Sequence, residues 1–294
     1  MLAVSLKKNE INFISVFKQT NQLNIEDYGS FKSNEFKSEQ VAKIKNRKKI
    51  KNTQNPSKKV MLFLDVKEVV INQFNYPKEI SLDDFLDWYN HSMFGNNKLT
   101  DYSSYHYEMN EDKFLSIYIK KKKQFEYYNI LSSQSLELKA ISLGIFSADY
   151  LARSFFEADS KAGYMVWSVG KETDEILIAR DGSVQCVFTL NRNGGQLSLV
   201  DFMGCKEIVD NAINMLNDKM KDDLKSFDVV DKIYMYKKSS GSDIKKIYNK
   251  KNKESITILN PLIKMQNFNK KKMNILDSSY LAEMGYIFKT LDKS

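Results

Sequence analysis

Residues Tyr164–Leu190 have the sequence YMVWSVGKETDEILIARDGSVQCVFTL, in which three apolar, β-rich runs are separated by two short polar turns. Gly170 begins the first turn, and Asp181-Gly182 forms the second. An Asp-Gly pair between two such runs favours a tight hairpin, because glycine readily adopts the positive φ angle that a two-residue turn requires. The stretch therefore predicts a three-stranded antiparallel β-meander.

The N-terminal residues 1–31 show the same pattern. Apolar or alternating runs at Leu2–Leu6 and Ile11–Phe17 and an extended stretch at Leu23–Tyr28 are joined by short polar segments. The two meanders lie about 160 residues apart, and an internal repeat indicates architecture more strongly than any single motif. We therefore expect a duplicated α/β fold with one meander in each half.

Length and composition describe a folded protein with room for two domains. The chain has 294 residues, of which 42% are hydrophobic, and each half is long enough to bury a core. No run approaches the roughly 18 apolar residues of a membrane helix. The short apolar start is followed by Lys7-Lys8 rather than preceded by a basic segment, unlike a signal peptide. We expect a cytoplasmic protein.

The net charge of +8 is the difference between 45 basic and 37 acidic residues, and all but four of the basic residues are lysine. Arginine is the preferred bidentate ligand of phosphate and guanine, so solvated surface is the favoured interpretation of the lysine runs. Binding to nucleic acid or to an anionic membrane surface is the alternative. The densest runs are at residues 43–51, 120–123, 245–253 and 270–272. Two histidines and two cysteines without ligand spacing predict no metal site.

Residues 60–138 contain two short apolar runs, then a helix at Ser81–Phe94 with Ser81 as its N-cap. An aromatic-rich segment and another strand and helix follow. Aromatic side chains are favoured anchors of protein interfaces. Four of them are therefore candidate partner-groove residues, namely Trp88, Tyr102, Tyr105 and Tyr107. Further along the chain, Phe202–Phe227 is predicted to be one long helix.

In this order of elements the chain resembles the actin-like ATPase (ribonuclease H-like) fold. More narrowly, it resembles the PilM family of type IV pilus assembly proteins and the cytoplasmic domain of the type II secretion protein GspL. The resemblance covers most of the chain and implies an α/β protein with three parts. Residues 1–59 and 139–160 would form the first actin-like subdomain and 60–138 an inserted PilM-type subdomain. Residues 161–294 would form the second actin-like subdomain, with a trimmed fourth subdomain.

The chain departs from active members of this fold in the first turn of each meander. There, the resemblance implies an Asp that holds metal or positions water and a Gly that admits phosphate to backbone amides. The corresponding positions hold Ser5 and Lys7 in the first meander and Ser168 and Gly170 in the second. A serine hydroxyl lacks the charge that binds magnesium well. A later turn, which receives the adenosine in active members, retains only Gly241.

These departures favour a non-catalytic scaffold, a pseudo-ATPase with no catalytic residues, metal or nucleotide cofactor. The resemblance implies a cytoplasmic protein peripheral to the inner membrane. Its partner would be the cytoplasmic tail of an inner-membrane protein, with a motor ATPase as a possible second partner. We expect the tail to add a strand in a groove between the first meander and residues 60–138.

Two alternatives remain open. An active ATPase or kinase of the same fold, using ATP and magnesium, would need Asp65, Asp174 or Asp181 to replace the missing acids. Glu172, Asp174 and Glu175 cluster in sequence, but a solvated face at a turn and strand edge is the favoured interpretation of that cluster. A nucleic-acid or membrane-surface protein would bind through its lysine runs, and its affinity would fall steeply with salt.

Overall fold

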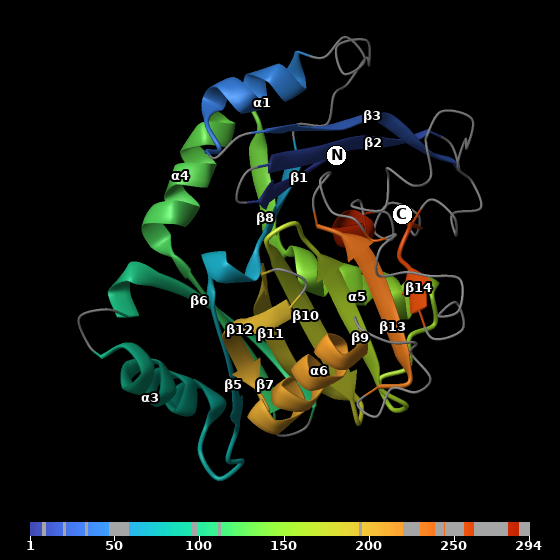
Figure 1. Ribbon diagram of the computed structural model, residues 1–294. Coiled ribbons are helices and arrows are strands. Elements are labelled where there is room, and N and C mark those ends of the chain that lie inside the picture. Colours follow the sequence, from blue (N-terminus) through green and yellow to red (C-terminus); the bar gives the residue numbers. More distant parts are fainter. Residues whose placement is uncertain are drawn as a thin grey trace.

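The computed structural model describes the whole chain except residues 8–9, 20–21, 33–34, 47–58, 96–98, 111–112, 194–195, 220–229, 239–243, 245–255, 262–281 and 288–294. Two large sheets carry the fold, and a small third sheet projects from one side (Figure 1).

The first large sheet has the order β3-β2-β1-β4-β8. Its first three strands form the predicted N-terminal meander, and β4 and β8 continue it in parallel with β1. The strands are β1 (Leu2–Lys7), β2 (Glu10–Gln19), β3 (Gln22–Lys32), β4 (Lys59–Leu64) and β8 (Glu137–Leu143). β1 is buried along its whole length, as expected for a strand in the middle of a covered sheet.

The second large sheet has the order β12-β11-β10-β9-β13-β14. Apart from the additional edge strand β12, its order and strand directions repeat those of the first sheet, which confirms the predicted duplication. The strands are β9 (Tyr164–Val169), β10 (Thr173–Arg180), β11 (Ser183–Asn193), β12 (Gln196–Gly204), β13 (Lys232–Lys237) and β14 (Ile256–Ile258).

Between β4 and β8 the chain forms the small sheet β5-β7-β6 and the helices α3 and α4. The Ser81 hydroxyl accepts a hydrogen bond from the Asp84 amide at 3.2 Å, so the predicted N-cap of α3 is confirmed. The elements are β5 (Val70–Asn75), α3 (Leu82–Phe94), β6 (Tyr102–Asn110), β7 (Lys113–Lys120) and α4 (Lys121–Ser132).

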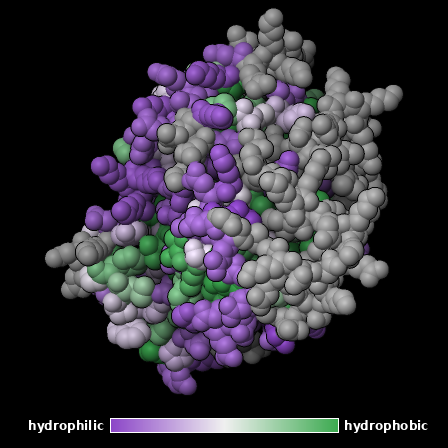
Figure 2. All heavy atoms as spheres, viewed as in Figure 1, coloured by the Kyte–Doolittle hydropathy of each residue, from purple (hydrophilic) through white to green (hydrophobic). Residues whose placement is uncertain are grey.

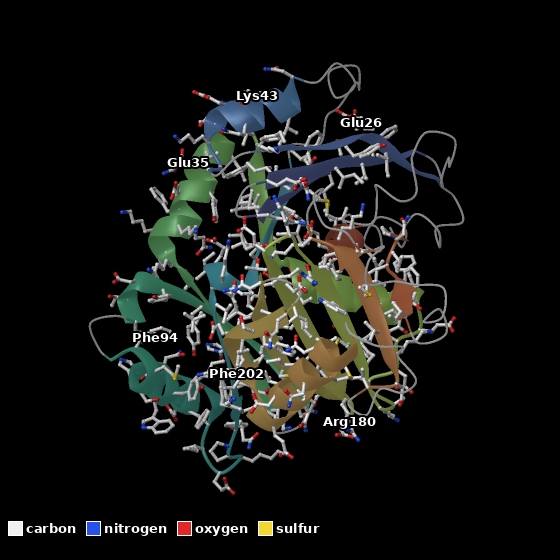
Figure 3. The ribbon with its side chains drawn as sticks, in the orientation of Figure 1. Glu26, Glu35, Lys43, Phe94, Arg180 and Phe202 are labelled. Carbon is white, nitrogen blue, oxygen red and sulfur yellow. The ribbon has the colours of Figure 1, made fainter. Side chains whose placement is uncertain are left out.

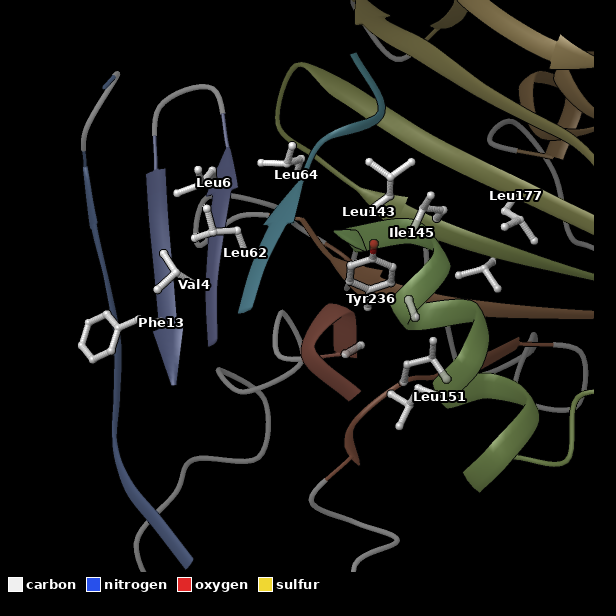
Figure 4. Close-up of a cluster of buried hydrophobic side chains, with 14 of the residues drawn as sticks. Val4, Leu6, Phe13, Leu62, Leu64, Leu143, Ile145, Leu151, Leu177 and Tyr236 are labelled. Carbon is white, nitrogen blue, oxygen red and sulfur yellow. The ribbon is translucent and has the colours of Figure 1, made fainter. Parts of the chain in front are cut away.

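The main hydrophobic core is continuous between the two large sheets. Helix α5 (Gly144–Phe155) packs on β9 and β10 and joins them to the first sheet. Figure 4 shows this core from Val4 and Leu62 through Ile145 on α5 to Leu177 on β10. Helices α1 (Ser38–Lys45) and α4 add to the same core, whereas α6 (Lys206–Lys219) covers the other face of the second sheet.

The predicted helix Phe202–Phe227 is wrong at its start, because Phe202 to Gly204 belong to β12. Pairing with β11 makes these residues a strand, because a neighbouring strand can override a weak local preference for helix. The strand ends at Gly204, which has a φ of +100° and whose added Cβ would lie 2.1 Å from the Gln185 carbonyl oxygen. Helix α6 begins only at Lys206, and residues 220–227 of the predicted helix lie outside the described residues.

Candidate functional site

The positions that the resemblance assigns to the phosphate turns lie at the carboxyl ends of the central strands β1 and β9. Ser5 and Ser168 are buried there, with exposures of 2% and 1%. Gly170 follows β9, and an added Cβ would lie 1.9 Å from the Thr173 carbonyl oxygen. Its amide donates a hydrogen bond to the Asp174 carboxylate at 2.9 Å. The turn therefore requires glycine for its own packing, and its amide already has a partner within the chain.

The space beside these turns holds buried charges from both halves of the chain. Lys238, just after β13, lies 2.7 Å from a Glu175 carboxylate oxygen and 3.3 Å from one of Asp65. Glu175 also accepts a hydrogen bond from the Val66 amide at 3.1 Å. All three charged side chains are buried. Lys238 thus connects the end of β4 in the first half to β10 in the second.

A second buried pair lies next to the first. The Lys7 ammonium is 2.8 Å from the Glu283 carboxylate, in residues 282–287 near the C-terminus, and it donates to the Lys238 carbonyl. Lys7, Asp65, Glu175, Lys238 and Glu283 together form what we call the ion cluster. Buried charges require partners of opposite sign, and here the chain supplies both signs itself. Lys7 therefore places a cation where the resemblance implies a small residue that admits phosphate.

Burial and charge pairing act against each other in this cluster. Burial raises the pKa of Glu175, although Lys238 favours its charged form. Burial also raises the pKa of Glu283, to about 7, and the Lys7 ammonium opposes that shift. Burial disfavours the Lys238 ammonium, but Glu175 and Asp65 more than offset this, so the pKa of Lys238 lies above its ordinary value.

The three acids considered for catalysis, Asp65, Asp174 and Asp181, do not lie together in one site. Asp174 is buried and accepts hydrogen bonds from the Trp167 indole and the Gly170 amide, and it pairs with Arg192. Asp65 is held by Lys238 in the ion cluster. Asp181 is exposed at the β10–β11 hairpin tip with a φ of +54°. The predicted solvated face is wrong for Asp174 and Glu175, whose side chains are buried, whereas Glu172 is exposed as expected.

A separate cavity of about 1080 Å³ lies beside β8, the edge strand of the first sheet. All residues from Leu138 to Leu143 line it, and Phe125 and Tyr128 of α4 line it from the side. These two rings are 64% and 52% exposed. Its other walls include residues of β4, β6, β7, β9, α5, the β10–β11 hairpin and the segment 282–287. We call this space the edge cavity.

The edge cavity differs from the predicted groove, because no residue of 1–31 lines it. Among the four candidate aromatics, Tyr105 lines it, whereas Trp88 is exposed on α3. Tyr102 stacks on Phe94, with ring centroids 4.7 Å apart. The side chain of Tyr107 lies outside the described residues. Sequence spacing alone missed Phe125 and Tyr128, because neither the start of α4 nor its exposed face was apparent.

A second apolar surface lies over β5 and β12, which lie against each other. Val70, Val200 and Phe202 are exposed there. Figure 2 shows apolar atoms gathered at this place, and Figure 3 labels Phe202 within it.

Several predicted features fall on undescribed residues. Gly241 and the lysine runs at residues 245–253 and 270–272 lie outside the described residues, as does most of the run at 43–51. The run at 120–123 is described, and Lys123 pairs with Glu68.

Lys43 on α1 and Arg180 on β10 lie at opposite ends of the molecule (Figure 3).

The repeated sheet order and the helix between the sheets define the actin-like ATPase fold, as predicted. No protein-family model and no curated protein matches the sequence. Among solved structures, the chain is similar to the PilM–PilN type IV pilus biogenesis complex. That match has a TM-score of 0.69 and 9% identity, and covers 99% of this chain and 98% of the other.

The chain is also similar to the cytoplasmic domain of EpsL, an inner membrane component of the type II secretion system of Vibrio cholerae. The TM-score is 0.50 at 9% identity, over 96% of this chain and 94% of that chain. At such identities the similarities establish the fold. Within the described residues, no helix combines the length and apolar character needed to cross a bilayer.

Proposed function

We propose that this protein is a non-catalytic scaffold of a type IV pilus or type II secretion-like assembly platform. In this proposal it acts at the cytoplasmic side of the inner membrane and binds an extended tail of an inner-membrane protein. The similarity to PilM and the EpsL cytoplasmic domain supports the setting. A motor ATPase is a possible second partner in the same setting.

The ion cluster is the observation that carries the non-catalytic part of the proposal. Nucleotide phosphates in this fold would need free backbone amides and a metal-binding acid beside the two turns. Instead, the Gly170 amide is bonded to Asp174, and Asp65 and Glu175 share Lys238. A polyphosphate entering here would have to break these pairs, which would leave buried charges without partners at a cost of several kcal/mol each.

Calorimetric titration of the full chain with ATP and magnesium tests this part. We expect no binding heat up to millimolar nucleotide and no phosphate release. Micromolar binding together with turnover would contradict the proposal. It would also support the alternative of an active ATPase, in which case substituting Asp65 or Asp174 should abolish turnover.

The edge cavity supports the binding part of the proposal. Strand β8 pairs with β4 on one side only among the described residues, so its other edge has backbone groups that an added strand could pair with. An extended peptide gains main-chain hydrogen bonds in this way, and adjacent pockets select its side chains. Phe125 and Tyr128 beside the edge have the exposed aromatic character of interface anchors.

Photocrosslinking in membranes of the source organism tests the binding part. A photoreactive phenylalanine analogue at Phe125 should crosslink to an integral inner-membrane protein through its cytoplasmic segment, identified by mass spectrometry. The same analogue at Trp88 is the matched control, because Trp88 is similarly exposed, at 63%, but lies outside the cavity. Equal crosslinking from both positions, or none from Phe125, would contradict the proposed cavity.

Binding through lysine runs remains the second candidate function. If the protein bound through its lysine runs, crosslinking would not be stronger from Phe125 than from Trp88. The affinity of such binding should also fall steeply as the salt concentration rises.

A further inference from the structure

We propose that the edge cavity selects an extended segment that carries acidic side chains, and that Lys121, Lys139 and Arg153 recognise its charge. This inference rests on the proposed function, because it names the chemistry of the peptide that the cavity would bind.

The charged residues of the cavity wall are three cations and one acid. The acid, Asp149, is 2% exposed and accepts hydrogen bonds from Arg153 at 3.0 and 2.8 Å and another from the Tyr164 hydroxyl. Its charge is therefore matched within the wall. The Arg153 side chain is still 51% exposed, and its planar guanidinium has further donors for a ligand carboxylate.

Lys139 lies at an irregularity of β8. Val60 of β4 pairs with Leu138, and the next residue, Met61, pairs with Ala140, so the pairing skips Lys139. Such bulges are rare between parallel strands, and they change the direction of a side chain where they occur. Here the extra residue is an exposed lysine in the wall of the cavity, on the strand whose edge a peptide would extend.

Lys121 lies on the same face of α4 as the aromatic anchors. It is four residues before Phe125 and seven before Tyr128, and these spacings bring side chains onto one helical face. All three line the cavity. Among the described residues, no carboxylate pairs with Lys121 or Lys139. The wall therefore combines an apolar surface with cations on two sides, which complements an extended segment of mixed apolar and acidic residues.

The test is selection of a random nonapeptide library on phage against the full chain. We expect enriched peptides to be rich in Asp and Glu and poor in Lys and Arg. The double variant Lys121→Glu/Lys139→Glu should bind the enriched peptides at least tenfold more weakly. Lys122→Glu is the matched control, because Lys122 is exposed on α4 but does not line the cavity. It should bind them like the wild type.

Basic or uncharged enriched peptides would overturn the charge inference, as would equal weakening by Lys122→Glu. Efficient competition by a short oligonucleotide, which would point to a nucleic-acid site, would also overturn it. A different result would show that the proposed function itself is wrong. In that case Phe125→Ala would leave the binding of every enriched peptide unchanged. Circular dichroism of each variant establishes that it is folded.

Discussion

Lys238 places one positive charge against two buried carboxylates from different halves of the chain. Lys238→Met would leave Asp65 and Glu175 buried without their shared cation, and removal of one partner from a buried pair costs about 3–5 kcal/mol. Urea unfolding at pH 7 should show this loss. Lys237→Met, one residue earlier and partly exposed, should change stability by less than about 0.5 kcal/mol. Equal effects of both variants would mean that the ion cluster does not stabilise the fold.

Glu283 makes stability depend on pH. Burial raises its pKa from 4.5 to about 7, so the folded chain holds this proton more tightly than the unfolded chain. The resulting stability is fully present below about pH 4.5 and is lost as the pH rises through 7.

Glu283→Gln should remove this dependence. The gain in unfolding free energy from pH 8 to pH 5 should therefore be about 2–3 kcal/mol larger in the wild type than in the variant. Urea unfolding at the two pH values measures the difference. The exposed Glu207→Gln should behave like the wild type. If the Glu283→Gln variant kept the pH dependence of the wild type, the titrating group would be a residue other than Glu283.

The turn between β9 and β10 shows, at the level of an element, that a glycine assigned by the resemblance to a phosphate turn is required by the packing of this chain. Gly170→Ala would bring a methyl group against the Thr173 carbonyl oxygen, and such overpacking costs about 3 kcal/mol. Gly182→Ala at the neighbouring hairpin should cost only about 1–2 kcal/mol, because its φ is +82° but no atom lies within 4 Å of the added Cβ. Thermal unfolding compares them, and an equal or smaller loss at Gly170 would contradict the packing role.

Elements with a strong local pattern were predicted well. The hairpin at Asp181-Gly182, the capped helix after Ser81 and both meanders appear at the expected places. The predicted helix from Phe202 failed, because β12 exists through its pairing with β11 and local sequence does not specify that neighbour. The edge cavity was missed for a similar reason. It is bounded by elements that lie far apart in sequence, including β8 and the β10–β11 hairpin.

At the scale of the whole molecule, the shared core and the ion cluster join the two halves. The core includes Leu62 of β4, Leu115 of β7, Leu151 of α5 and Leu177 of β10. We therefore expect one cooperative unfolding transition. Far-UV circular dichroism and near-UV circular dichroism should give the same midpoint, and ATP with magnesium should leave it unchanged. Two separated midpoints would show that the halves unfold independently.

The sequence by itself determined the two meanders, because alternating apolar residues and short polar turns act over only a few positions. Together with the resemblance, it also predicts that serines occupy the positions of the two phosphate-turn acids. Only the tertiary structure decided what fills the space beside them. Lys7, Asp65, Glu175, Lys238 and Glu283 are separated by up to 276 residues, and no local pattern predicts that these five charges meet. Buried charged side chains require partners of opposite sign. Which partners lie within reach depends on how the two sheets pack.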